Sequence, residues 1–151
     1  MTNSRFAVAI LLTATLAFAE DPFVGTWKLD LNKTKINATA PKSWKTEISF
    51  KVEAVGPNQH HVTGFSADGK VTETHENIFD GKERQDAQGL SHREIRIDER
   101  RVRITTKGPK GTLVSNPVVS DHGETLTEAF EGNSPLGGRP MDGVVLVWRK
   151  Q

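Results

Sequence analysis

The sequence contains no cysteine, and this absence excludes several kinds of chemistry at once. Without thiols, the chain of 151 residues cannot form disulfides, zinc–thiolate sites, a thiol nucleophile or a lipid-modified N-terminal cysteine. Small extracellular domains that lack disulfides must rely on their hydrophobic core. A chain of this length can bury roughly two-thirds of its unfolded surface, so a single core-stabilised domain is expected.

An excess of charge of one sign is also missing. The net charge is +1, with 26% charged and 35% apolar residues, which is an ordinary globular composition. Lysine and arginine are scattered among the acidic residues, which is typical of solvated strand faces. We therefore expect neither a nucleic acid nor an anionic membrane surface as a partner.

Long hydrophobic runs are absent after the N-terminus. Arg5 is followed by the uncharged residues 6–19, which end in a small-x-small sequence at Ala19, directly before Glu20. A membrane-spanning helix needs about 20 apolar residues, and this run is shorter. The pattern predicts a secretory signal peptide over residues 1–19, a single domain over residues 20–151 with no membrane span, and a periplasmic or secreted location.

No stretch of the remaining chain shows a sustained helical period, whereas strand-like alternation recurs. In residues 44–52 the even positions are Trp, Thr, Ile, Phe and Val, and the odd positions are mainly polar. Similar alternation covers residues 94–98, 101–105 and 125–130, where Leu126, Glu128 and Phe130 share one face. Residues 144–148 are apolar on both faces, which indicates a central or closing strand.

Turn signals separate these runs. Asp-Gly pairs occur at residues 68–69, 80–81 and 142–143, and they favour tight hairpins because both central residues of a type I′ turn need positive φ. No segment is long enough for a parallel crossover, so a nearest-neighbour antiparallel meander is expected. About eight strands with short turns fit the domain, and closure into a barrel removes the exposed edges. A two-sheet sandwich is the main structural rival.

The opening residues, Phe23 to Leu29, resemble the Gly-x-Trp first strand that lipocalins and fatty-acid-binding proteins share. The chain as a whole resembles exported bacterial lipocalin-like proteins. The matching pieces are residues 25–29, 32–35, 79–82, 96–98, 118–121 and 125–127 and the C-terminal residues 143–151. The resemblance implies an all-β, up-and-down barrel of about 8–10 strands and no established reaction. It also implies that Gly25 and Trp27 form the barrel base, with Arg149 stacked on Trp27.

The sequence departs from the fatty-acid-binding proteins at two places. Residues 32–43 show no helical period, so the helix–turn–helix lid of those proteins is not expected. Their C-terminal Arg-x-Tyr carboxylate clamp is replaced by Leu146 and Trp148. The polar residues 32–41 are expected to cross the barrel mouth or run along its side, and residues 132–143 form a Gly/Pro-rich loop or a broken hairpin.

The large apolar residues at alternating positions are candidates for lining a cavity. We predict that a small ligand would contact Ile48, Phe50, Phe65, Ile95, Ile104, Phe130, Leu146 and Trp148. Eight-stranded barrels are just wide enough either to be filled by side chains or to hold one small ligand. The sequence does not decide between these two interiors.

The histidines offer the main alternative chemistry. A two-residue turn at residues 68–69 places His75 opposite Val62, with Glu73 on the side of His75 and His60 diagonal to it. A metal or haem site there is geometrically allowed, but solvent-facing polar pairs are the favoured interpretation, so no metal or cofactor is predicted. Glu73, Glu76 and Glu83 are carboxylates that any strand-rich protein would offer by chance.

Three functions remain open at this point. The preferred one is an exported, monomeric protein that binds or carries a small apolar ligand without catalysis. The second is a filled barrel that contacts a partner in the envelope through its surface. The third, an enzyme or haem protein, is disfavoured because neither a Gly-x-Ser-x-Gly elbow nor a phosphate-binding loop is present.

Overall fold

The structure is a computed structural model, and it describes residues 20–151. The predicted signal peptide, residues 1–19, lies outside the described residues. The strands are β1 (Gly25–Leu29), β2 (Ser49–Gly56), β3 (Gln59–Phe65), β4 (Val71–Ile78), β5 (Asp80–Gln85), β6 (Ser91–Asp98), β7 (Arg101–Gly108), β8 (Gly111–Val119), β9 (Thr125–Gly132) and β10 (Val145–Lys150). One short 3-10 helix, η1 (Lys42–Lys45), lies between β1 and β2, and no helix of the described part could span a membrane.

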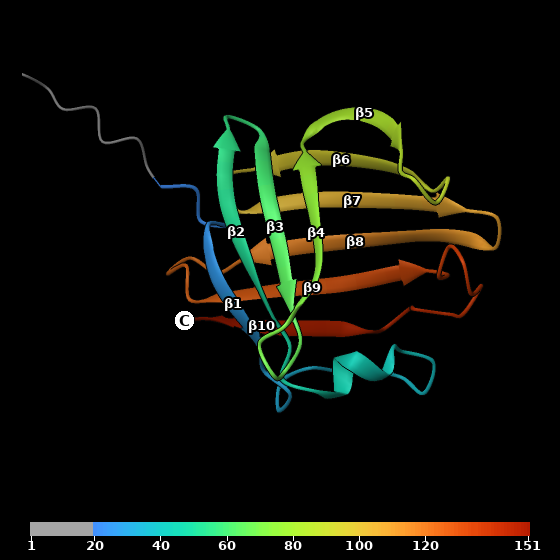
Figure 1. Cartoon of the computed structure of the whole chain (residues 1–151), viewed down its shortest axis with the longest axis horizontal. Coiled ribbons are helices and arrows are strands. Elements are labelled where there is room, and N and C mark those ends of the chain that lie inside the picture. Colours follow the sequence, from blue (N-terminus) through green and yellow to red (C-terminus); the bar gives the residue numbers. More distant parts are fainter. Residues whose placement is uncertain (1–19) are drawn as a thin grey trace, which may run out of the picture.

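All ten strands form one antiparallel sheet in the order β4-β3-β2-β1-β10-β9-β8-β7-β6-β5. The first and last strands pair, with Trp27 opposite Lys150 and Leu29 opposite Trp148. The sheet therefore curls on itself, and strands β2 to β4 cross over strands β6 to β10 (Figure 1). This arrangement confirms the predicted all-β meander closed into a barrel and excludes the two-sheet sandwich.

The barrel is nearly closed rather than fully closed, because β4 and β5 are not paired with each other. The side chain of Glu94 bridges this gap. Its carboxylate, on β6, accepts a hydrogen bond from the backbone N–H of Ile78 at the end of β4. The buried Phe79 side chain fills the junction from the inside.

Two local predictions were wrong. Asp80-Gly81 does not form a hairpin turn but begins β5, because the Asp80 carboxylate accepts the N–H of Lys82 at 3.0 Å and bends the chain locally. The strand predicted from Trp44 begins only at Ser49, and Trp44 lies on η1. Pro41 directly precedes η1, and proline is compatible with the start of a helical turn because it needs no N–H there.

The loops after β1 and before β10 are joined to each other. Lys35 forms an isolated antiparallel bridge with Val145, so the first loop runs along β10 instead of crossing the barrel mouth. The Asn37 side chain donates to the carbonyl of Pro140 at 3.1 Å. As expected, no helix–turn–helix lid follows β1.

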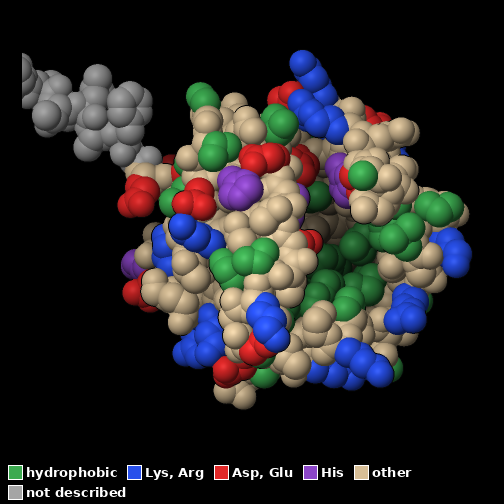
Figure 2. Space-filling view, viewed as in Figure 1, with side chains coloured by type: hydrophobic (Ala, Val, Ile, Leu, Met, Phe, Trp, Pro, Cys, Tyr) green, Lys and Arg blue, Asp and Glu red, His purple; other side chains and the backbone are tan. Residues whose placement is uncertain are grey.

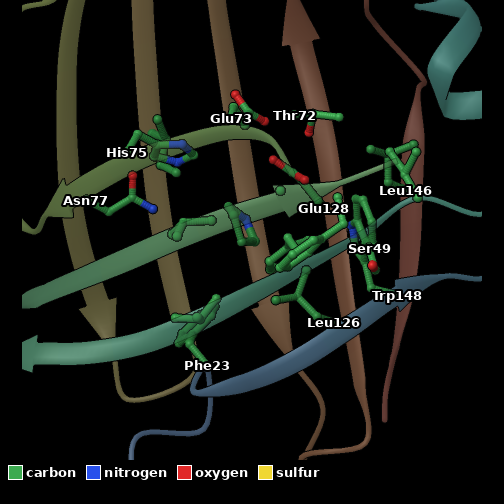
Figure 3. Close-up of a pocket in the computed structure, with 18 of the residues that line it drawn as sticks. Phe23, Ser49, Thr72, Glu73, His75, Asn77, Leu126, Glu128, Leu146 and Trp148 are labelled. Atoms are coloured by element: carbon green, nitrogen blue, oxygen red, sulfur yellow. The ribbon is translucent and has the colours of Figure 1, made fainter. Parts of the chain in front are cut away.

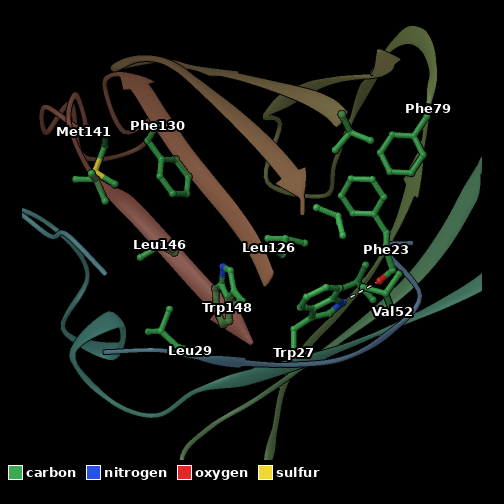
Figure 4. Packing of buried hydrophobic residues seen from close by; sticks show 14 residues of the cluster. Phe23, Trp27, Leu29, Val52, Phe79, Leu126, Phe130, Met141, Leu146 and Trp148 are labelled. Atoms are coloured by element: carbon green, nitrogen blue, oxygen red, sulfur yellow. Dashed lines mark hydrogen bonds between the residues drawn. The ribbon is translucent and has the colours of Figure 1, made fainter. Parts of the chain in front are cut away.

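Trp27 seals the barrel base. Its side chain is fully buried, and its indole N–H donates to the carbonyl of Phe23 at 2.9 Å (Figure 4). Gly25 has φ +138°, a backbone conformation that residues with a Cβ atom rarely adopt, so glycine is favoured at this position.

Lys150, not Arg149, provides the cation over Trp27. The Lys150 Nζ lies 5.4 Å from the centre of the Trp27 ring, whereas the Arg149 Nε lies 3.2 Å from the Asp30 carboxylate. The prediction for Arg149 was wrong because successive side chains of a strand point to opposite faces. Trp148 faces inward, so Lys150 shares its face and Arg149 points outward.

Candidate functional site

The barrel holds a cavity of about 610 Å³ whose wall is mainly apolar. Its floor includes Leu126, Leu146 and Trp148 (Figure 3). The surface is hollowed beside β4, where hydrophobic side chains are visible from outside (Figure 2). The interior is therefore not filled, which contradicts the alternative of a solid barrel.

The cavity wall contains most of the residues that the sequence singled out. Ile48, Phe50, Phe65, Ile104, Phe130, Leu146 and Trp148 line it. Phe50 and Trp148 pack edge to face, with ring centres 4.7 Å apart. Contact of these residues with a ligand stays a prediction.

Ile95 is the exception, because β6 has the opposite orientation from the one expected. Ile95 does not line the cavity, and Ile97 is 52% exposed. The polar residues Glu94 and Arg96 face inward instead, where the Ile78 N–H and the Asp21 carboxylate bind them. These partners lie far away in sequence, so the alternation alone favoured the wrong face.

Glu128 is the deepest acidic residue on the cavity wall. It projects from β9 into the apolar interior between Leu126 and Phe130, opposite Leu146 of β10 (Figure 3). Burial raises the pKa of its carboxyl group, and the hydrogen bond donated by the buried Ser115 hydroxyl only partly offsets this effect. Ionised Glu128 is therefore disfavoured in the folded protein.

Replacing Glu128 with glutamine should stabilise the protein, and more so in mild alkali than in mild acid. The folded-state pKa of Glu128 lies above its unfolded value, so wild-type stability falls as pH rises through the interval between the two. Glutamine keeps an acceptor for Ser115 and removes this loss. Thermal unfolding should show a larger gain in Tm at about pH 8 than at about pH 5.

Glu131→Gln is the matched control for this experiment, because Glu131 lies on the same strand but is exposed. It should change Tm little at either pH. Equal gains at both pH values for Glu128→Gln would contradict the assigned cause.

A second polar group lies along β4 at the open side of the cavity. Glu73, His75 and Asn77 alternate on the inward face (Figure 3), and His75 pairs with Val62 as the turn predicted. Burial lowers the pKa of His75, and the nearby carboxylate of Glu73 only partly opposes this shift. The His75 ring is therefore neutral at neutral pH.

His60 lies in the interior rather than facing solvent, which corrects the favoured interpretation. It is 2% exposed, and its Nε2 lies 2.8 Å from the Asp21 carboxylate. Because Asp21 holds His60, the predicted alternative of a site with Glu73 and His75 loses one member. In residues 20–151 no group of three His, Asp or Glu side chains is placed to hold a metal ion.

Asp21 ties the start of the described chain to two distant strands. Its carboxylate accepts from His60 of β3 and from Arg96 of β6, each at 2.8 Å. Phe23 and Phe79 flank the guanidinium, with ring centres 5.6 and 5.0 Å away. Burial alone would raise the pKa of Asp21, but the hydrogen bonds and the charges of His60 and Arg96 lower it to about 2.

The sequence reasoning missed the polar members of the wall, although one signal was present. Alternation places Glu128 on the face of Leu126 and Phe130, and a charged residue on an apolar face is unusual. Trp44 also lines the cavity, from η1, where its ring packs on Phe130 with centres 5.1 Å apart. No local pattern indicated that η1 would cover this side.

Comparison with solved structures shows similar barrels at low sequence identity. A point mutant of the fluorescent protein UnaG has a TM-score of 0.60 and 13% identity over 86% of this chain and 96% of its own. The Echinococcus granulosus fatty-acid-binding protein 1 has a TM-score of 0.56 and 15% identity over 85% and 97%. A Schistosoma mansoni fatty-acid-binding protein, solved in complex with arachidonic acid, has a TM-score of 0.54 and 12% identity over 86% and 96%.

Sequence comparison adds no relative, since no family model and no curated protein matches the chain. The structural likeness covers nearly the whole of each neighbour, and it extends over the strands described above. At these identities the likeness concerns the fold. The chain therefore has the fold of the lipocalin-like, or calycin, β-barrels to which fatty-acid-binding proteins belong.

Proposed function

We propose that this protein binds a small apolar molecule inside its barrel and carries or sequesters it, without catalysing a reaction. The observation that carries the proposal is the cavity of about 610 Å³ with its apolar wall. Binding cavities for small molecules typically have volumes of roughly 300–1,000 Å³ and a few polar groups in a mainly apolar lining. The fatty-acid-binding proteins of the same fold support this function by analogy.

Binding is expected to depend on free space beside Val62. Val62 lines the cavity from β3, so tryptophan at this position would occupy part of the space that a ligand needs. We expect Val62→Trp to weaken binding of an apolar fluorescent probe such as 1-anilinonaphthalene-8-sulfonamide by at least about 10-fold. Fluorescence titration of the purified domain, residues 20–151, measures this change.

Val55→Trp provides the matched control, because Val55 is 56% exposed on the neighbouring strand β2. The same residue is introduced there outside the cavity, and probe affinity should stay within about 2-fold of wild type. Equal affinity of the wild type and Val62→Trp would place the probe elsewhere and contradict a binding role for the cavity.

We further propose that the protein acts outside the cytoplasm after removal of residues 1–19. The uncharged run after Arg5 and the small-x-small sequence before Glu20 support export. Expression of the full chain in a bacterium, followed by fractionation and N-terminal sequencing, tests this. A product that begins at Glu20 in the periplasm or medium supports export, and an uncleaved product in the cytoplasm contradicts it.

A further inference from the structure

The cavity wall contains no lysine and no arginine that could neutralise an anionic ligand. Among the described residues that line the cavity, Glu73 and Glu128 are acidic, and His60 is already held by the Asp21 carboxylate. Removing a carboxylate from water without a paired cation costs several kcal/mol. A bound fatty-acid anion would therefore meet two acidic side chains and no free counterion.

Neighbouring groups do not supply the missing charge. Arg96 is not part of the wall, and its guanidinium is held by Asp21 at 2.8 Å between Phe23 and Phe79. The chain contains no tyrosine that could donate a phenolic hydrogen bond. On the inward face of β10, Leu146 and Trp148 line the cavity, whereas Lys150 lies over Trp27 at the barrel base and is not part of the wall.

The buried polar groups suit an uncharged partner. The Ser115 hydroxyl donates to the Glu128 carboxyl group, which leaves further acceptor capacity on that carboxyl group. The indole N–H of Trp148 beside it is sealed from the cavity, because its nitrogen is buried, and it lies close enough to Glu128 to lower the pKa of that carboxyl group. Because ionised Glu128 is disfavoured, its carboxyl group offers the cavity both a donor and an acceptor.

We propose that the cavity selects an uncharged apolar molecule with a hydroxyl group that docks at Glu128, in preference to a fatty-acid carboxylate. A hydroxyl group matches a carboxyl group because each of them donates one hydrogen bond and accepts another. The ligand hydroxyl donates to the carbonyl oxygen of Glu128 and accepts from its O–H, and the apolar body lies among the aromatic side chains. This inference rests on the proposed function, because it names the ligand class of the same cavity.

Four probes that share the same unbranched chain and differ in the head group test the ligand class: decanol, its methyl ether, decanoate and decylamine. Isothermal titration at about pH 7.5 should show decanoate binding at least about 10-fold more weakly than decanol, because its charge has no partner. The methyl ether should bind about 3- to 10-fold more weakly than decanol, because it cannot donate to Glu128. Decanoate or decylamine binding as tightly as decanol would overturn the inference.

Variants connect this preference to Glu128. We expect Glu128→Leu to lower decanol affinity about 3- to 10-fold and to abolish the preference for decanol over its methyl ether. Glu131→Leu on the same strand is the control, because Glu131 is exposed, and it should leave both affinities unchanged. Circular dichroism verifies that both variants are folded.

The two ways of failing are distinguishable. If wild type binds decanol and its methyl ether equally, or if Glu128→Leu still prefers decanol, the hydroxyl site is wrong while the carrier function stands. If none of the four probes binds, and if Val62→Trp also leaves the affinity for the fluorescent probe unchanged, the proposed function itself is wrong.

Discussion

Replacing Trp27 with alanine is expected to cost about 3–5 kcal/mol of the free energy of unfolding. The Trp27 side chain is 0% exposed, so its removal leaves a large void at the barrel base. The variant also loses the hydrogen bond to the carbonyl of Phe23 and the ring beneath the Lys150 ammonium. Small domains are stable by only about 5–15 kcal/mol, so the loss removes a large share of the total.

Urea denaturation followed by circular dichroism measures this effect. Trp44→Ala is the matched control, because the same residue type is removed from η1, where Trp44 is only partly buried and packs on Phe130. We expect a loss of about 1–2 kcal/mol for this control. Equal losses from the two variants would contradict the assigned role of Trp27 in closing the barrel.

The strands whose inward face is mainly apolar could be predicted from sequence. Val102 and Ile104 of β7, and Leu126 and Phe130 of β9, alternate with polar residues and do face the interior, although Glu128 shares the inward face of β9. The period of two is reliable there because most inward side chains meet other apolar side chains. The predicted pairing of Val62 with His75 is also present, but the predicted two-residue turn at Asp68-Gly69 is wrong, because Asp68 lacks positive φ and the register of β3 and β4 shifts between Gly64 and Phe65.

Strands with polar inward residues could not be predicted in the same way. On β6 both faces contain aliphatic and charged residues, and the partners Asp21 and Ile78 decide which face turns inward. His60 has the same dependence on Asp21, which lies 39 residues away in the chain. A local pattern contains no information about such partners.

From the sequence, a cavity was only one of two possible interiors, and the other was a barrel filled by side chains. The wall residues follow from alternation, but the free volume depends on how far β4 and β5 separate and on where η1 lies. Neither feature has a local signature in the sequence. The chemical character of the wall, set by Glu128 and by the lack of lysine and arginine, became visible only when all strands were placed together.

The second large effect is expected at Asp21, where Asp21→Ala should cost about 2–4 kcal/mol near neutral pH. The variant removes the carboxylate that binds His60 and Arg96 and leaves both groups in a mostly buried site. Arg96 would keep one long hydrogen bond, from its Nη1 to the carbonyl of Glu99 at 3.4 Å, and its Nε is already buried without a hydrogen bond. Asp68→Ala is the control, because the Asp68–Lys70 pair is exposed and should contribute less than about 1 kcal/mol.

Acid should abolish the difference between wild type and Asp21→Ala. The folded-state pKa of Asp21 is about 2, below its ordinary value of 3.8, so the charged form stabilises the fold above about pH 4. This contribution disappears as pH falls from about 4 to about 2, because wild-type Asp21 then takes up a proton and loses its charge. Urea denaturation across this range should show the two proteins converging. If the difference in stability between the two proteins persists undiminished at about pH 2, Asp21 acts through packing. In that case the ion pairs of Asp21 with His60 and Arg96 do not anchor the N-terminal segment.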